Sequence, residues 1–285
     1  MKKISILMIV MIAAAGLMAE DWNTAADVSI TMNQNSYSDN WAGEEKGSIS
    51  WVFNANFLAE KQLAAKVHNK NTLKLAFGQT HNQMVDAMGD KYWAKPDKST
   101  DLIDFESMFR FTLGAFVDPF ASLRLESQFL DQSVADDAKI FNPNTLTESF
   151  GIARVFIKDD TQELSTRLGG AFKQYMDSNL DDNSSDGGLE FVGIYTKPFK
   201  DNVIKYSTNL NLYKPMFYSE SDAVEGTDME DSWKMVRMNW QHDVDISLTS
   251  LINLKLYVQL LYNEMVIDEI QFKETLGLGL SYKLL

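Results

Sequence analysis

The chain has 285 residues, no cysteine and a formal net charge of -14, from 26 Lys and Arg residues against 40 Asp and Glu residues. A chain without cysteine has no thiolate catalysis, cysteine-ligated metal, disulfide or lipid-modified N-terminal cysteine. The excess of acidic residues repels phosphate backbones, so we expect no nucleic-acid partner.

The N-terminal segment has the three-part layout of a secretory signal peptide. Lys2 and Lys3 form a basic start, the apolar run 4–17 follows, and Ala19 stands before two acidic residues. This layout predicts cleavage after Ala19, and the apolar run is short for a membrane-spanning helix. The predicted organisation is a signal peptide followed by one exported β-barrel domain: 1–19 and 20–285.

The mature chain repeats the period-2 alternation of strands with one apolar face. In 48–57, for example, Ile49, Trp51 and Phe53 alternate with polar residues. A tilted strand needs roughly 9–11 residues to cross a bilayer, whereas strands of globular proteins average about 5–6, and many of these segments reach the longer length. The predicted strands lie near 28–32, 48–57, 72–78, 103–113, 121–129, 145–158, 161–173, 187–196, 203–213, 236–248, 254–262 and 276–284.

The connections between these segments alternate between long and short. Outer-membrane barrels have long loops outside and short turns in the periplasm, whereas a sandwich with Greek-key links has no reason to sort its loops in this way. All five prolines are expected in loops or turns, Pro215 in a loop. Long connections are predicted at 33–47, 80–100, 131–144, 174–187 and 213–232, and short ones at 60–68, 117–120, 158–161, 197–202, 249–253 and 264–269, the last an outer loop.

The pattern predicts an all-β fold: a transmembrane, antiparallel, up-and-down β-barrel of about 12 strands. Its short turns would be periplasmic and its long acidic loops extracellular, in the outer membrane of a Gram-negative bacterium. Three charged residues, Glu148, Arg154 and Glu274, fall in phase with apolar faces, which a position at the rim or a β-bulge would explain. In 187–196 Glu190 shares a face with Val192, so the inward side stays open there.

Two segments resemble known barrel proteins. The C-terminal sequence 277–285 is similar to the signal by which barrel proteins are recognised for assembly, although Leu285 replaces the usual terminal aromatic residue. The Asn-Trp-Ala-Gly sequence at 40–43 and the strand 71–78 resemble a family of outer-membrane barrel proteins of unknown function, over roughly 30–160. The first resemblance implies the barrel-assembly machinery as a partner, and the second implies a barrel without known catalytic residues.

The inward faces carry charges of both signs, which we take as candidate lumen residues. A tight turn after the fourth predicted strand would place Arg110 near Glu126 and Arg124 near Thr112, and Lys255 would lie near Asp245. Such pairs either fill and brace the lumen or set the selectivity of a narrow aqueous pore. The candidates are Arg110, Arg124, Glu126, Arg167, Arg237, Asp243, Asp245 and Lys255.

The predicted number of strands and the size of the inward side chains limit the open space inside the barrel. A barrel of about twelve strands lies between the filled eight-stranded type and the open porins, so a wide pore is not expected. Large residues such as Trp233, Met235 and Tyr257 would favour a plugged lumen, whereas the Ser- and Asn-lined strands 48–56 and 205–211 favour water.

Catalytic and metal-binding patterns are weak. His68 is expected in a turn, His81 in an outer loop, and His242 on the lipid face or at a rim; none has a spacing suited to a metal or to nucleophilic catalysis. Acidic residues cluster in 177–186 and 220–231, either as divalent-cation ligands or as solvated loops. We expect no enzyme, no cofactor and no assigned metal site.

The sequence therefore favours a narrow, porin-like channel for small solutes or ions, embedded in outer-membrane lipids. The alternative is a non-conducting barrel that serves envelope integrity or binds cations or partners through its acidic loops.

Overall fold

The computed structural model describes residues 22–38, 46–134, 137–159 and 161–283. The predicted signal peptide lies outside this described part. Thirteen strands are present in the described residues: β1 (Asn23–Asn35), β2 (Ser48–Ala64), β3 (Val67–Val85), β4 (Lys91–Trp93), β5 (Asp97–Phe111), β6 (Asp118–Ser127), β7 (Asn144–Asp159), β8 (Gln162–Met176), β9 (Ser184–Phe199), β10 (Ile204–Tyr218), β11 (Arg237–Ser247), β12 (Ile252–Asn263) and β13 (Ile267–Lys283).

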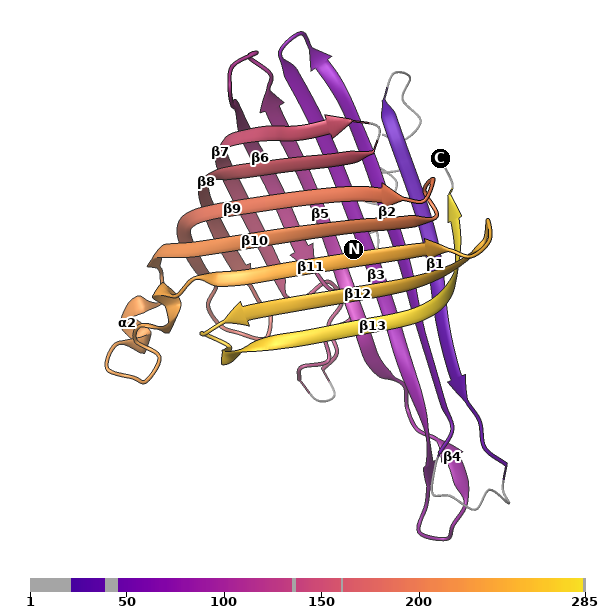
Figure 1. The fold of residues 1–285 in the computed structure, drawn as a ribbon. Helices are drawn as coiled ribbons and strands as arrows, with labels where there is room; N and C mark the ends of the chain where they lie inside the picture. The colour runs from indigo at the N-terminus through magenta and orange to yellow at the C-terminus, as the bar shows by residue number, and fades with distance from the viewer. Residues whose placement is uncertain (1–21, 39–45, 135–136, 160, 284–285) are drawn as a thin grey trace.

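All strands except the short β4 close into one antiparallel barrel (Figure 1), as the sequence predicts. Each strand pairs with its neighbours along the chain, β3 pairs directly with β5, and β1 closes the ring against β13. In Figure 1, β8 to β13 cross in front of β1 to β5, so strands on opposite walls run in very different directions. This crossing is the geometry of strongly tilted strands in a closed barrel.

The predicted alternation of long and short connections is confirmed. Strand β4 lies within one long connection, and the helix α2 (Ser221–Val224) and the 3-10 helix η1 (Ser232–Lys234) lie within another. Most strands run further than predicted, because the ladder continues beyond the apolar pattern into polar residues. Long connections at one end are 36–47, 86–96, 128–143, 177–183, 219–236 and the shorter 264–266, and short ones at the other end are 65–66, 112–117, 160–161, 200–203 and 248–251.

Side chains alternate between the two faces of the wall along each strand. On β1, Ser29 and Thr31 are buried on the inward face, whereas Ile30 and Met32 are exposed on the outside. Phe150, in the middle of β7, is 71% exposed. Apolar side chains therefore form the exterior of this barrel and polar side chains its interior, the reverse of a soluble protein.

The charged residues that fall in phase with apolar faces in the sequence lie in different environments in the structure. Arg154 lies on the outer surface at the short-turn rim, where its guanidinium stacks 3.8 Å from the ring centroid of Phe116 and donates to the Phe116 carbonyl. Glu148 and Glu274 lie on the exterior itself, within their strands. Glu190 is buried and points inward, so the inward face of β9 includes Val192.

The expected position of Pro215 is wrong. This proline lies inside β10, not in a loop, and the pairing of β10 with β9 shifts register between Pro215 and Phe217. A proline cannot donate a ladder hydrogen bond, and a bulge is a position within a sheet where that loss is tolerated.

Two inward glycines bring the backbones of β7 and β8 unusually close. A Cβ added to Gly169 would lie 2.1 Å from the carbonyl oxygen of Phe150, and one added to Gly151 would lie 2.2 Å from that of Leu168. The two glycines face each other in the ladder. The absence of side chains here lets the wall curl tightly around the lumen.

Helical structure is scarce in the described residues. The helix α2 spans four residues and η1 spans three, both on the long-loop side. Within the described part of the chain, no helix has both the length and the apolar character needed to span a membrane.

Candidate functional site

Asp186 is the centre of a buried polar cluster in the lumen near the long-loop end. Its side chain is 0% exposed and accepts hydrogen bonds from the hydroxyls of Tyr213 at 2.7 Å and Tyr175 at 2.9 Å. Arg237 Nη1 lies 2.6 Å from Asp186 Oδ2 and 2.7 Å from the Tyr175 oxygen. Lys173 stacks over the Tyr213 ring at 3.9 Å. Four neighbouring strands, β8 to β11, are thus tied together by charge-assisted hydrogen bonds.

A second cluster continues along the same wall. Arg167 Nη1 lies 2.5 Å from Glu106 Oε1 across the lumen, and its Nη2 lies 3.8 Å from Glu190 Oε2. Glu190 also accepts from Asn211 at 3.0 Å and from Ser149 at 3.2 Å. Arg167 on β8 therefore connects β5 to β9 through space, although other strands lie between them in the sheet.

A third cluster braces β5 against β6. Arg124 donates through Nε and Nη2 to both carboxylate oxygens of Asp104, at 2.8 and 3.0 Å, and Nη2 lies 2.9 Å from Glu126. Arg110 lies nearer the short-turn end, where its Nε is 3.7 Å from Asp118. The bidentate pair with Asp104 fixes the guanidinium plane of Arg124 in the lumen wall.

Two expected contacts in this hairpin are wrong. Arg110 pairs with Phe120, not with a position near Glu126, and Thr112 lies in the connection, away from Arg124. The turn is longer and begins earlier than the sequence analysis assumed, so the whole register shifts. Because a hairpin register depends on its turn, one misplaced turn displaces every cross-strand pair.

The remaining candidates lie on β11 and β12. Lys255 Nζ lies 3.4 Å from Asp245 Oδ2, as the sequence predicts, and it also donates to Ser29 Oγ of β1 at 3.1 Å. Asp243 lies on the same face, between Ser207 of β10 and Tyr257 of β12 in the ladder. Lys255 therefore joins the last strands of the barrel to the first.

The wall that contains the closure between β13 and β1 is lined differently. Its inward positions combine many small polar residues and glycines with separate charged residues such as Asp27, Lys74 and Lys273, and within the described part of the chain they form no ion-pair cluster like those of β5 to β11. These positions include Ser29, Thr31, Ser50, Asn54, Asn56, Thr275, Gly277 and Gly279. The lumen is thus asymmetric, with a braced charged wall facing a smooth polar one.

Two of the large residues expected to plug the lumen are not in strands. Trp233 belongs to η1 and Met235 to the connection after it, and the Trp233 ring packs 6.3 Å from that of Tyr218. Both residues precede the ladder of β11, which begins at Arg237. Tyr257 lies on β12, as the pattern indicates.

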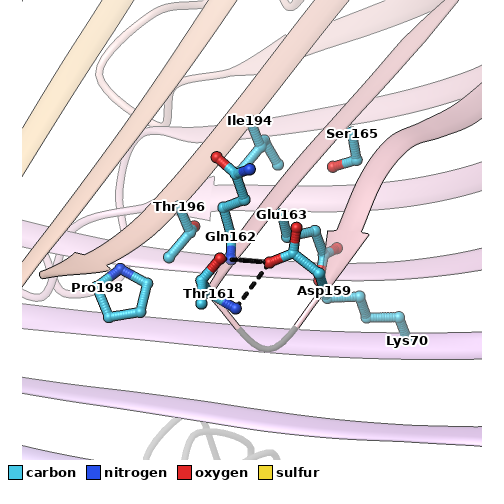
Figure 2. A pocket seen from close by; sticks show the side chains of 9 residues that line it. All are labelled: Lys70, Asp159, Thr161, Gln162, Glu163, Ser165, Ile194, Thr196 and Pro198. Carbon is cyan, nitrogen blue, oxygen red and sulfur yellow. Dashed lines mark hydrogen bonds between the residues drawn. The ribbon is translucent and has the colours of Figure 1, made fainter. Parts of the chain in front are cut away.

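A cavity of about 280 Å³ opens at the short-turn end of the lumen (Figure 2). Its lining includes Lys70 of β3 and Glu163 of β8, together with the turn after β7. In that turn, Asp159 Oδ1 accepts from the backbone amides of Thr161 and Gln162 at 2.8 and 2.9 Å. The cavity forms a polar vestibule with charges of both signs.

Two long connections are clamped together by buried amide and carboxylate groups. Asn142 Nδ2 donates to Asp131 at 2.7 Å and to Asp177 at 2.8 Å, and its oxygen accepts from the amide of Ser178. Asn179 Nδ2 donates to Asp131 at 2.7 Å. Burial of Asp131 opposes its ionisation, but the hydrogen bonds outweigh this and lower its pKa to about 2.

The expected acidic clusters do not form single sites. Asp177 belongs to the loop clamp, whereas Asp186 lies in the lumen, although the two are close in sequence. Among the described residues, no group of three or more His, Asp or Glu side chains is arranged to hold a metal ion. The sequence pattern did not assign Asp177 to a loop and Asp186 to a strand, because β9 begins at Ser184, earlier than predicted.

His68 and His81 lie in a strand, not in the turn and the loop that the sequence analysis expected, whereas the expected outward position of His242 is confirmed. His68 and His81 lie in β3, where His68 Nε2 is 3.9 Å from Glu60. His242 lies on the exterior of β11, and its Nδ1 is 2.9 Å from the hydroxyl of Tyr206. Its ring also packs 4.6 Å from that of Trp240. These aromatic and imidazole side chains form an outward cluster, not a catalytic arrangement.

The important residues that the sequence analysis missed are the acidic and phenolic partners of the arginines. Asp104 and Glu106 lie within the predicted strand 103–113, but their partners depend on register. Tyr175 lies at the end of β8, beyond the predicted boundary at 173, whereas Tyr213 lies within β10, at the boundary of the predicted strand 203–213. Strand length was the signal that could have identified them.

Comparison with known proteins gives a family match over part of the chain. The model of a family described as a protein of unknown function (DUF3078) matches residues 32–132, roughly a third of the chain. This agrees with the resemblance to barrel proteins of unknown function, while the Asn-Trp-Ala-Gly sequence at 40–43 lies outside the described residues. No curated protein matches the chain.

Several solved structures are similar in overall fold. The COG4313 outer membrane channel from Pseudomonas putida F1 is 14% identical and has a TM-score of 0.41; the match covers 91% of this chain and 94% of that one. The translocator domain of the autotransporter NalP from Neisseria meningitidis is 10% identical, with a TM-score of 0.36 and coverage of 95% and 92%. The beta domain of the Bordetella autotransporter BrkA is 12% identical, with a TM-score of 0.38 and coverage of 92% and 100%.

Proposed function

We propose that this protein is a β-barrel of the bacterial outer membrane that acts as a narrow channel for small solutes or ions. The observation that carries the proposal is the lumen's asymmetry. Ion-pair clusters occupy the wall from β5 to β11, while the opposite wall presents small polar side chains and glycines. Space next to the smooth wall, hydrated by hydroxyl and amide groups, forms the proposed pathway.

The exterior supports the membrane location. Large apolar side chains such as Ile30, Phe53 and Phe150 are exposed on the outside of the barrel, where a bilayer would cover them. Along the paired ladders of the barrel, backbone polar groups are satisfied between strands, which is the condition for crossing hydrocarbon. Outer-membrane lipids are accordingly the proposed surroundings, and the barrel-assembly machinery the proposed route of insertion.

The charged wall supports ionic selectivity as part of the same proposal. Arg124, Arg167 and Arg237 are each held by carboxylates at fixed positions, so their charges are balanced and rigid. A solute passing along the opposite wall meets alternating charges at close range. Selectivity in such a pore depends on its width and on the charges that line it.

Single-channel recording in planar lipid bilayers tests this proposal directly. The refolded barrel is expected to give small, stable, ohmic steps in KCl. Asn56 points into the lumen from β2, where it donates to Asp27 at 3.0 Å. Asn56→Trp places an indole beside the smooth wall and is expected to lower the conductance by about twofold or more.

A matched control comes from the same strand. Phe53 lies on the exterior of β2 and is exposed, so Phe53→Trp places the same indole on the same strand without entering the lumen. Its conductance is expected to equal that of the native chain. Absence of ohmic current from a folded barrel would contradict the channel function, and equal conductance in both variants and the native chain would contradict the proposed pathway beside the smooth wall.

The ion-pair clusters also favour a second candidate, a non-conducting barrel that stabilises the envelope. Arg167 spans the lumen from β8 to Glu106 on β5, and such a brace gives mechanical rigidity at the expense of open space. In this case the folded barrel would carry no current, and the loss of Arg167 would affect stability alone.

A further inference from the structure

The closure between β1 and β13 is the shortest ladder among the barrel strands. It consists of five residue pairs, from Asp27 with Lys283 to Thr31 with Gly279. The same β1 shares thirteen pairs with β2, and β13 shares eleven with β12. The barrel is therefore closed by a short seam near its short-turn end.

Beyond this seam the two strands separate. Figure 1 shows β1 running with β2 and β3 toward β4, while β13 begins on the opposite side, near α2. Among the described residues, 267–278 of β13 and 32–35 of β1 have no partner in each other's strand. Each keeps its ladder on the other edge, to β12 and to β2 respectively. A wedge-shaped gap in the hydrogen-bonded wall results.

This gap lies at the level of the apolar exterior. Outward side chains along the free edge of β13 are highly exposed: Phe272 and Leu276 at 62% and Leu278 at 54%. Met32 on β1, which would face Leu278 if the ladder continued, is also exposed. The free edge therefore runs through the band that lipid would contact.

A free strand edge does not face hydrocarbon, because its amide and carbonyl groups would have no partners there. Water from the lumen can satisfy them if the interior communicates with the gap. Glu274 supports hydration at this position, since it lies on the outward face of β13 between Phe272 and Leu276. A carboxylate is costly on a lipid face and inexpensive beside water.

The inner side of the gap offers little obstruction. Gly277 and Gly279 present no side chains, and an added Cβ at either would contact Thr31 of β1. Thr31 thus marks the apex of the wedge, with polar, small groups inward and apolar groups outward. A polar head group fits the inner side of this opening, and an apolar chain fits its outer side.

We propose that the β1–β13 gap is a lateral portal through which small single-chain amphipathic molecules pass between the lumen and the membrane. The polar head enters the hydrated lumen along the smooth wall, while the apolar chain stays between the edges of β1 and β13. This inference rests on the proposed channel function and specifies a substrate class for the same lumen.

The test uses proteoliposomes with NBD-labelled lysophosphatidylcholine in both leaflets. Albumin extracts the probe from the outer leaflet only, and it is too large to enter a narrow barrel. The native chain is expected to accelerate extraction of inner-leaflet probe at least about tenfold over protein-free liposomes. Equal rates with and without the protein would overturn the portal.

Disulfide locking identifies the route, because the chain contains no native cysteine. Asn33→Cys with Gly277→Cys continues the register of the seam, so oxidation would draw the edges together. The oxidised pair is expected to lose the acceleration and to regain it on reduction. Gln34→Cys with Ile49→Cys cross-links a ladder that is already complete, and should change nothing.

Hydrogen exchange of the native chain in nanodiscs needs no variant. Amides of 270–278 that point toward β1 are expected to exchange at least about a hundredfold faster than the amides of β12, whose edges are both paired. Protection of all amides in 270–278 would show that protein covers this edge, and would overturn the portal even if the disulfide variant failed to fold.

Ion conductance separates the two proposals. If the oxidised Asn33→Cys and Gly277→Cys pair keeps the KCl current and loses lysolipid transfer, both the channel and the portal stand. Retained transfer in the oxidised pair, with normal current, overturns the portal alone. Lysolipid transfer by a native barrel that carries no current overturns the channel and leaves the portal.

Discussion

At the scale of single residues, the interior is organised by arginines that hold several acceptors at once. Arg237 contacts both Asp186 and the Tyr175 hydroxyl, and Arg124 contacts both Asp104 and Glu126. A buried carboxylate is stable only while its cation and donors remain, because desolvation otherwise favours its neutral form. These contacts should therefore matter more to stability than exposed ion pairs do.

Replacement of Arg237 by alanine tests this point. Asp186 is fully buried and would keep only its two tyrosine donors, so the free energy of unfolding is expected to fall by about 3 kcal/mol. Urea unfolding in lipid vesicles, followed by tryptophan fluorescence, measures the change. Lys158 and Glu163 form a largely exposed pair at 3.9 Å, so the control Lys158→Ala should cost less than about 1 kcal/mol. Equal effects of the two changes would contradict the assigned role of Arg237.

The sequence indicated which residues face inward more reliably than it indicated their partners. Period-2 phase alone assigns Arg124 and Glu126 to one face. The pairing of Arg124 with Asp104 depends on the register of the β5–β6 hairpin, which a six-residue connection sets and no apolar pattern reveals. Arg167 and Glu106 are far apart in the chain and meet only across the closed barrel, so closure itself creates their contact.

At the scale of elements, close approach of neighbouring strands makes certain glycines indispensable. Gly169 and Gly151 face each other where β7 and β8 nearly touch, and a methyl group has no room on either. The cost of adding one cannot be relieved by a side-chain rotation, because the obstructing atoms belong to the backbone.

Gly169→Ala is expected to reduce the free energy of unfolding by about 3 kcal/mol and to lower refolding yield. Gly193→Ala on β9 is the matched control, because its added Cβ would meet only the Phe191 ring, at 3.4 Å. Refolding into detergent, scored by the electrophoretic shift between heated and unheated samples, compares the two. A Gly169→Ala variant that folds as well as Gly193→Ala would show that the two strands can move apart.

The clamp between the connections 128–143 and 177–183 should respond to acid. The pKa of Asp131 is lowered to about 2 from its usual 3.8, so its ionised form stabilises the clamp. That contribution is complete above the usual pKa and is lost as the pH falls from about 4 to about 2. Amide exchange at Ser133, Ser178 and Asn179 is expected to rise over this interval beyond the intrinsic pH effect.

Asp131→Asn provides the control for the acid response. An amide cannot gain or lose a proton in this range, so the variant should show weakened protection at every pH and no transition between pH 4 and 2. An identical transition in Asp131→Asn would assign the acid response to another group.

At the scale of the whole molecule, the exterior determines the solvent in which the barrel is stable. Phe150 is the clearest example, because it is largely exposed in the middle of β7 and makes no interior contact that an exterior change would disturb. A charge at this position would stabilise a water-soluble barrel, whereas it would destabilise a membrane barrel.

Phe150→Arg is therefore expected to lower stability in lipid vesicles by about 2–4 kcal/mol, as for arginine near the bilayer midplane. Met88 is 90% exposed in the connection between β3 and β4, beyond the barrel wall, so Met88→Arg should have almost no effect. Urea titration in vesicles measures both. A neutral Phe150→Arg, in a protein that stays dispersed without detergent, would contradict the membrane location.

The barrel plan was predictable from the sequence because strand phase and loop length are local properties. The alternation in 48–57 and the short polar connections determine the topology without any long-range information. The open edge of β13 was not predictable, since 276–284 reads as an ordinary strand. Only the geometry of β1, which follows β2 and β3 away from β13, reveals that five residue pairs close the ring.

The same five pairs have a consequence for how the chain folds. All other barrel ladders join strands separated by one connection, which for β3 and β5 includes the short β4, so each can form as a local hairpin within microseconds to milliseconds. The pairing of Thr31 with Gly279 closes a loop that contains nearly the entire polypeptide. This ladder has the highest loop-closure entropy cost, so we expect it to form last. Synthesis must therefore be complete before the ring can form. A truncated product keeps two unpaired strand edges, which promote aggregation.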